Sequence, residues 1–422
     1  MEKLTSVGSK IQGSGYARKV HRREIHGLMV YFGMPVFWIS ICPTDIHSPI
    51  LLVLAGEEID YDILGNLDKF SSLSKRAEIA AKDPVAASLY FNLVIDAFIE
   101  FLLGYGKESG GLLGHVSTYS GAVEEQGRGT LHIHMLVWLQ GYTSRSGLES
   151  RFQDDEFKKK LLQYLEDTIH EAFLDPDADH NNLNVSEVSF ARPINPVDPE
   201  FDSKFSNDVD RLVTVANTHC HTFTCYKYGK SGDCRFGFPR DLISQSTVSV
   251  EGEIKLRRTH CDVNNFNPFI MECLRSNHDI KFVASGKDGK ACAFYMTDYA
   301  TKTSLPTHQM FPLMAATLKN LDASPALNTN SIDKSKQIIV KLLNRITTEQ
   351  ELSGAHVCNF LLGFSDKKCP HLFSNLNVHS CLAWVADNET EFTDKSNALG
   401  DEDGPEAASL MVAEGKPRTC VG

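Results

Sequence analysis

The most informative apolar pattern in this chain lies at residues 123–139, where two extended runs flank a glycine-rich connection. The first run ends near Gln126, residues 127–130 (Gly-Arg-Gly-Thr) form the turn, and Leu131–Leu139 returns as a mostly apolar run. Strand-forming residues on both sides of a short glycine-containing connection are typical of a β-hairpin. We therefore predict a hairpin whose second strand is buried in the middle of a sheet.

Other segments predict both strands and helices around this hairpin. Residues 36–42 form a short apolar run that Pro43 ends, which indicates a buried strand. Residues 84–105 carry apolar side chains at helical spacing, and we expect an amphipathic core helix there, not a membrane span. Together these patterns predict an α+β fold with a central antiparallel sheet, flanking helices and a small Cys/His-rich subdomain.

Two histidines on the predicted second strand are candidate metal ligands. Because side chains alternate along a strand, His132 and His134 project from the same face, about 7 Å apart along the chain. Two imidazoles at this spacing can share one ion, and Glu124 or Gln126 on the opposing strand could add an oxygen ligand. The alternative is that both histidines are hydrogen-bonded residues of the core.

A second group of metal-type side chains follows at residues 219–239. Eleven cysteines without a secretory signal at the N-terminus favour a reducing compartment, in which thiols are free or bound to metal. The alternative to a metal site is a hairpin with free thiols, and His260 and Cys261 are further candidate ligands. The predicted zinc ligands are His219, His221, Cys225 and Cys234.

Two tyrosines lie in the segment 291–303, which the sequence predicts to be a helix. Tyr295 and Tyr299 are four residues apart and therefore share one helix face, with Lys302 near Tyr299. Taken alone they are packing residues. Beside a metal-binding hairpin, a phenolate could attack a phosphodiester and form a covalent phosphotyrosine. Since the pKa of tyrosine is about 10, the metal or Lys302 would have to stabilise the oxyanion.

These motifs, in this order, resemble the helicase-like N-terminal (Rep) domain of Helitron transposons, particularly the fungal type. That family belongs to the HUH endonucleases, which initiate rolling-circle replication. The resemblance runs from about Tyr16 to Phe373. It rests on the motifs PVFWISI from Pro35, DIHSP from Asp45, EEQGRGTLHIH from Glu124, CYKY from Cys225, CRF from Cys234, NNFN from Asn264, DIKF from Asp279, YMTDYATK from Tyr295 and QELS from Gln350.

The resemblance implies an HUH/Rep-like nuclease core that uses Mg²⁺ or Mn²⁺. It implies His132 and His134 as metal ligands, with Glu124 or Gln126 as the third. It also implies Tyr295 and Tyr299 as nucleophiles that nick single-stranded DNA and carry its 5′ phosphate. Arg128 or Lys302 would stabilise the negative charge that develops on the phosphate during the reaction. Such a substrate implies the nucleus as the location, with no membrane partner.

The sequence departs from the family pattern at several points. Gly127 and Leu131 stand where the family often has lysine and proline. No Gly-x-x-x-x-Gly-Lys-Ser/Thr loop occurs, so we expect no nucleoside triphosphate to bind, no ATPase activity, and a helicase only as a separate partner. The rival hypothesis is a truncated, inactive transposon remnant that binds single-stranded DNA or a protein partner. A zinc hydrolase of the amidohydrolase type would need a repeating βα pattern, which the sequence lacks.

The net charge of −12 argues against strong non-specific affinity for DNA, although residues 10–23 are locally basic. Composition and motifs together predict six segments along the chain. These are a basic, partly disordered arm (1–27), the Rep-like core with the hairpin (28–145), a helical acidic insertion (146–210), the zinc segment (211–245), the tyrosine-helix region with C-terminal helices (246–374) and an acidic, disordered tail (375–422).

Overall fold

The structure is a computed structural model, and the descriptions below concern the residues that it places. These are residues 13–59, 72–125, 129–141, 145–176, 183, 185–226, 233–249, 252–284, 294, 297, 312, 315–316, 319, 340–341, 352–375, 380, 382 and 411–414.

A five-stranded antiparallel sheet forms the centre of the molecule, in the order β6-β1-β3-β2-β7. The predicted hairpin is β2 (Val116–Glu125) and β3 (Leu131–Leu139), and β3 is the middle strand. Strand β1 (Phe37–Ile41) lies between β3 and β6 (His278–Phe282), and β6 and the short β7 (Lys367–Lys368) form the two edges. The chain therefore has the predicted α+β fold, with helices packed on an antiparallel sheet.

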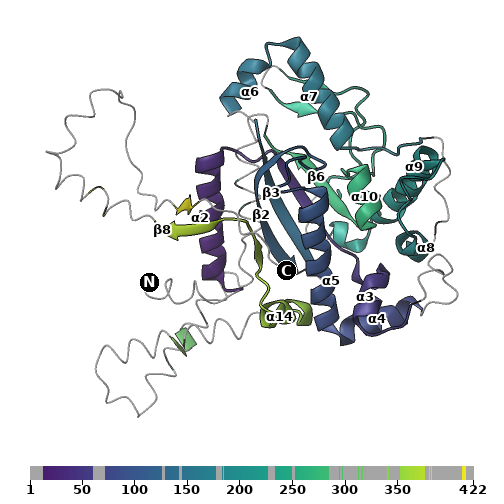
Figure 1. The fold of residues 1–422 in the computed structure, drawn as a ribbon, viewed down its shortest axis with the longest axis vertical. Helices are drawn as coiled ribbons and strands as arrows, with labels where there is room; N and C mark the ends of the chain where they lie inside the picture. The colour runs from purple at the N-terminus through teal and green to yellow at the C-terminus, as the bar shows by residue number, and fades with distance from the viewer. Residues whose placement is uncertain are drawn as a thin grey trace.

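Strand β3 is buried on both faces because helices cover the sheet from both sides (Figure 1). Its odd-numbered side chains, such as Ile133 and Met135, pack with Phe91 and Ile95 of α5 (Pro84–Ala97). Its even-numbered side chains lie on the opposite face, where Leu136 and Trp138 pack with α2 (Gly15–Phe32). Because side chains alternate along a strand, His132 and His134 also lie on the face that α2 covers.

Helix α2 corrects the expectation of a partly disordered basic arm for residues 15–27. Ile25 and Leu28 are buried against Trp138, and the buried His21 ring lies 3.1 Å from the Ser120 hydroxyl. The spacing of residues 21, 25 and 28 places all three on one helix face. The Ser14 hydroxyl caps the start of the helix by accepting the N–H of Ala17. Lys19, Arg22 and Arg23 in the same helix give the segment a basic composition, which is typical of a solvated arm.

The α5 helix continues as a short π-helix, η4 (Phe98–Leu102), and ends before Gly104, which has φ of +62°. Residues 84–102 are long and apolar enough, by length and composition, to cross a membrane. In this fold Phe91, Ile95 and Phe98 pack against the sheet. The buried Asn92 amide also donates to the Oδ1 of Asn359, at 2.7 Å, in α14 (Gly354–Leu361). These contacts are those of a core helix.

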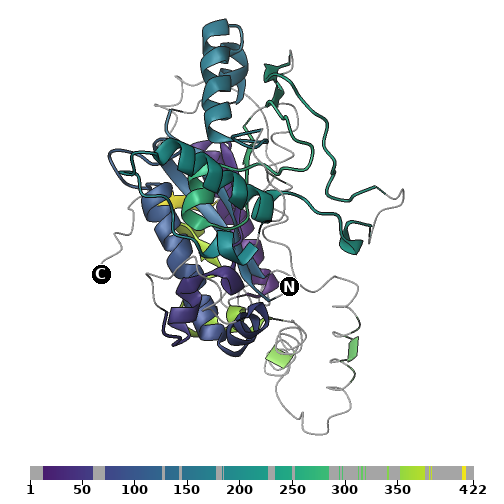
Figure 2. The same cartoon turned by 90° about the vertical axis from the view of Figure 1, so that its right-hand side faces the viewer.

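The chain between the hairpin and β6 forms a largely helical region on one side of the sheet (Figure 2). Its buried side chains, among them Val209, Leu212 and Phe266, form an apolar cluster separate from the one on the sheet.

Strand β9 (Met411–Glu414) lies within the tail that was expected to be disordered, so that expectation is wrong for residues 411–414. The remaining elements are η1 (Asp45–His47), α3 (Pro49–Leu54), α4 (Leu73–Lys82), α6 (Arg145–Arg151), α7 (Asp155–Thr168), α8 (Val185–Phe190), α9 (Phe201–Leu212), η5 (Val213–Asn217), η6 (Phe223–Tyr226), β4 (Thr247–Val248), β5 (Ile254–Lys255), α10 (Pro268–Leu274), β8 (Leu372–Asn375) and β9 (Met411–Glu414).

A buried cluster of charges joins α10 to α9 and α8. The Arg275 guanidinium donates to both oxygens of Asp208, at 2.7 and 3.2 Å, and to the carbonyl of Val188. The Glu272 carboxyl lies 3.6 Å from Arg275 and accepts the N–H of Ile194 at 2.6 Å. Burial raises the pKa of Glu272 to about 7, and the Asp208 carboxylate adds to this rise against the opposing Ile194 and Arg275 contacts.

The Glu272→Gln variant is expected to weaken the pH dependence of stability between about pH 4.5 and 7. A carboxyl whose folded-state pKa is raised stabilises the fold fully below its unfolded value, and this contribution is lost as pH rises through about 7. Glutamine stays neutral and keeps the oxygen that accepts from Ile194. Urea unfolding at pH 5 and pH 8 should show a smaller decrease for Glu272→Gln than for wild type or Glu156→Gln, an exposed control. An equal decrease in all three would contradict this assignment.

Candidate functional site

The two histidines of β3 lie beside the turn of the hairpin. The Nε2 atoms of His132 and His134 are 2.9 Å apart, and both side chains are buried. The register pairs His132 directly with Glu124 of β2, and one Glu124 carboxylate oxygen lies 3.8 Å from each of the two Nε2 atoms. Two imidazole nitrogens and a carboxylate oxygen thus converge on one point.

The electrostatic setting keeps both rings neutral near pH 7. Burial lowers the pKa of His132 to about 4, against an opposing contact with the Glu124 backbone. Burial also lowers the pKa of His134 to about 3, and the neighbouring His132 lowers it further. A neutral imidazole has a lone pair to give to a metal, whereas a protonated imidazole does not.

The donor set fits a hard divalent ion. Two ligands held at right angles about 2.1 Å from an octahedral ion are about 3.0 Å apart, close to the separation of the two histidine nitrogens. One carboxylate and two imidazoles leave coordination positions for substrate oxygens, as in the facial arrangement of two histidines and a carboxylate. His132, His134 and Glu124 would hold the ion; Gln126, the alternative third ligand, lies outside the described residues.

The neighbouring Glu125 points away from the histidines, because side chains alternate along β2. Its carboxylate accepts the N–H of Ser353, at 2.6 Å, at the start of α14, and lies 3.7 Å from the buried His356 ring. Glu125 therefore ties the end of the hairpin to α14, while Glu124 faces the histidines.

Trp38 is a site residue that sequence reasoning missed. Its ring stacks on His134 with the centroids 4.9 Å apart and the planes 20° apart. Trp38 pairs with Leu136 in the β1–β3 register, so it occupies the face that carries the histidines. The signal was available in part, because residues 36–42 were predicted as a strand, but the register that brings Trp38 beside His134 is a tertiary property.

The Cys/His segment brings a second set of ligand-type atoms together. The Nε2 of His219 lies 3.5 Å from the Cys225 sulfur and 3.4 Å from the Cys234 sulfur. One ligand atom from each of His219, His221, Cys225 and Cys234 lies within 4.8 Å of the others. His260, Cys261 and Asp262 form a separate, third group of this kind.

The remaining predicted catalytic residues, Arg128, Tyr295, Tyr299 and Lys302, lie outside the described residues. Phe294, which directly precedes Tyr295, is described. Its ring centroid lies 5.0 Å from that of His26 on α2. Phe294 thus contacts α2, the helix that packs on the face of β3 carrying the histidines.

A groove of about 1000 Å³ opens at the same end of the sheet as the hairpin turn. Its walls include Gly129 and Thr130 of the turn, Thr44 after β1, and Ser353 and Gly354 at the start of α14. The groove thus includes Thr130, two residues before His132 of β3, and it is also lined by Pro84 and Ala87 of α5.

Comparison with known protein families found a match to part of this chain. Residues 1–137 match the family model described as the Helitron helicase-like domain at the N-terminus, and this range includes Glu124, His132 and His134. The match does not extend to the Cys/His segment or to the two tyrosines. A search of curated proteins found no match. The resemblance is thus confirmed over residues 1–137, the part of the chain that matches the Helitron helicase-like N-terminal model.

Proposed function

We propose that this protein is an HUH-type endonuclease and strand transferase for single-stranded DNA, dependent on Mg²⁺ or Mn²⁺, that acts in rolling-circle (Helitron) transposition. The observation that carries the proposal is the convergence of the His132 and His134 nitrogens with the Glu124 carboxylate, inside the matched region. A bound ion would polarise a non-bridging oxygen of the scissile phosphate.

The nucleophile in this proposal is the phenolic oxygen of Tyr295 or Tyr299. It forms a bond to phosphorus while the bond from phosphorus to the 3′ oxygen breaks. The phenol gives up its proton to solvent, and the leaving 3′ oxygen takes up a proton from solvent. The products are a 5′-phosphotyrosine and a free 3′ hydroxyl. The reverse reaction with a new 3′ hydroxyl joins strands, and two tyrosines would allow two strand ends to be held in turn.

Two features of the fold support the tyrosines as partners of the histidines. Phe294, immediately before Tyr295, contacts His26 of α2, the helix that covers the histidine face. The groove beside Gly129 and Thr130 offers room for several nucleotides at the same end of the sheet. Arg128, in the hairpin turn, is the proposed cation for the phosphate, with Lys302 as the alternative.

The proposal is tested with a pool of single-stranded oligonucleotides of randomised sequence, labelled at the 3′ end and incubated with the protein and Mn²⁺. The 3′ label should become attached to the protein on a denaturing gel, whereas a 5′ label should appear in a shorter free strand whose 3′ end a polymerase can extend. The double variant Tyr295→Phe, Tyr299→Phe should form no adduct, because phenylalanine has no nucleophilic oxygen.

Tyr31→Phe is the matched control, because Tyr31 is an exposed tyrosine on α2. It should form the adduct at the wild-type level. Absence of any adduct from wild-type protein with either Mn²⁺ or Mg²⁺ would contradict the proposed activity. An adduct that persists in the double variant would contradict the assignment of the tyrosines.

A further inference from the structure

We propose that His219, His221, Cys225 and Cys234 bind a structural Zn²⁺ ion, separate from the metal site on β3. A tetrahedral zinc ion with bonds of about 2.3 Å to sulfur and about 2.0 Å to nitrogen has neighbouring nitrogen and sulfur ligands about 3.5 Å apart. The distances from the His219 Nε2 to the two cysteine sulfurs are 3.5 and 3.4 Å. The side chains are thus arranged as the corners of such a site.

The local backbone supports this arrangement of the cysteines. The N–H of Thr222 donates to the Cys225 sulfur at 3.3 Å, and the N–H of Arg235 donates to the Cys225 carbonyl at 3.0 Å, which holds the two cysteine-bearing turns together. Gly237 follows Cys234 with φ of +73°, a conformation that glycine adopts without strain, and its N–H donates to the Cys234 carbonyl. Such contacts orient a ligand before the metal arrives.

The histidine ring is also fixed by its neighbours. Phe238 stacks on His219 with the centroids 4.3 Å apart and the planes 8° apart, and Cys225, Cys234 and Phe238 form a small buried cluster. This cluster lies away from the main core, so few apolar contacts hold the segment folded. A segment with so little core of its own is the kind that metal ligation stabilises.

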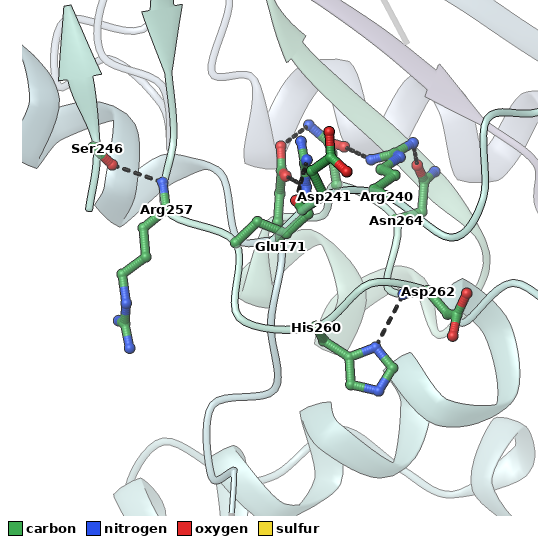
Figure 3. Close-up of polar contacts among 10 residues, drawn as sticks. Glu171, Arg240, Asp241, Ser246, Arg257, His260, Asp262 and Asn264 are labelled. Carbon is green, nitrogen blue, oxygen red and sulfur yellow. Dashed lines mark hydrogen bonds and ion pairs between the residues drawn. The ribbon is translucent and has the colours of Figure 1, made fainter. Parts of the chain in front are cut away.

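Both ends of the ligand-bearing segment are held by the chain at residues 258–265. The N–H of His219 donates to the Asp262 carbonyl at 2.8 Å, and the N–H of Arg240 donates to the Cys261 carbonyl at 2.8 Å. The Arg240 guanidinium donates to Asn264 and Asn265, at 2.7 and 2.6 Å, and Asn265 donates to Glu171 (Figure 3). The ends of the segment are therefore fixed near each other, which favours closure of the four ligands on one ion.

The third group, His260, Cys261 and Asp262, does not make an equivalent site. The Asp262 N–H donates to the His260 Nδ1 at 3.2 Å (Figure 3). The Cys261 thiol donates to the Asp262 carboxylate at 3.3 Å. These atoms bond to one another within three successive residues. In the group of four, two histidines and two cysteines from separate turns complete a tetrahedral set, and a closed set of four protein ligands is the mark of a structural zinc site.

The test measures zinc bound to the full-length protein, purified without a histidine tag, in a His132→Ala, His134→Ala background so that the site on β3 contributes none. This protein should retain about one zinc per chain after gel filtration. Cys225→Ser and Cys234→Ser should each lower the ratio to near zero, because serine does not replace a thiolate ligand. Cys220→Ser is the matched control, since Cys220 is exposed and lies next to His219 outside the set.

A second measurement does not depend on whether the Cys225→Ser and Cys234→Ser variants fold. Metal-stripped protein titrated with Co²⁺ should develop the absorption of tetrahedral cobalt with thiolate ligands, at one equivalent, in the background protein and in Cys220→Ser. The zinc proposal is overturned if the background protein retains no zinc and Co²⁺ produces no thiolate absorption. It is also overturned if Cys220→Ser loses as much zinc as Cys225→Ser. Neither outcome bears on the nuclease proposal, which the adduct assay tests separately.

Discussion

The double variant His132→Ala, His134→Ala is expected to lose binding of Mn²⁺ at the hairpin and, with it, formation of the DNA adduct. The nitrogens of these rings are 2.9 Å apart and supply two of the three candidate ligands. Changes to residues that merely support metal ligands weaken metal affinity by about 10- to 100-fold. Removing two ligands should therefore weaken Mn²⁺ binding by more than about 100-fold.

Calorimetric titration with Mn²⁺ measures the first effect, and the labelled oligonucleotide assay measures the second. His115→Ala is the matched control, because His115 is exposed and directly precedes β2, at the end of the hairpin opposite the turn. It should keep wild-type affinity. The proposed metal site is wrong if the double variant binds Mn²⁺ as tightly as wild type. A wild-type chain that binds Mn²⁺ but nicks no DNA would instead favour the inactive-remnant hypothesis.

Arg275→Met is expected to destabilise the fold by about 3 to 5 kcal/mol, because it removes the cation from a buried pair and leaves a charge uncompensated. Arg275 and Asp208 are both 8% exposed at the side chain, and the guanidinium bonds to both oxygens of that carboxylate. The Val188 carbonyl also loses its two guanidinium donors. Chemical denaturation at pH 7 measures the change.

Two further variants separate lost charge compensation from lost packing. Adding Asp208→Asn to Arg275→Met should recover part of the stability, since the buried carboxylate that Arg275 compensated is then neutral. Lys204→Met removes an exposed cation paired with Asp198 and Glu200, and it should change the free energy of unfolding little. A small effect of Arg275→Met, similar to that of Lys204→Met, would show that the buried pair adds nothing to stability.

The hairpin is the part of the site that sequence reasoning predicted most fully. The apolar run after a Gly-Arg-Gly-Thr turn predicted β3, and strand alternation predicted that His132 and His134 share a face. The choice of third ligand, Glu124 or Gln126, stayed open. The register of β2 on β3 sets Glu124 opposite His132 and turns Glu125 toward α14, whereas Gln126 lies outside the described residues.

The α2 helix shows where local composition misleads. Its basic residues predicted a solvated arm, yet its buried face carries Ile25 and Leu28, which pack with Trp38 and Trp138 of two strands of the sheet. A short amphipathic segment has little stability by itself, so it folds only when a tertiary surface accepts its apolar face. The sequence of residues 15–32 shows that face but not the surface that buries it.

The sequence by itself determined the α+β class, the hairpin, the shared face of the two histidines and the resemblance that the family match confirms over residues 1–137. These depend on local periodicity and on motifs, which a linear chain displays. Only the tertiary structure decided that α2 covers the histidine face, that Trp38 stacks on His134, and that Arg275 joins Asp208. Each of these contacts joins residues far apart in the chain, and their pairing depends on how strands and helices pack together.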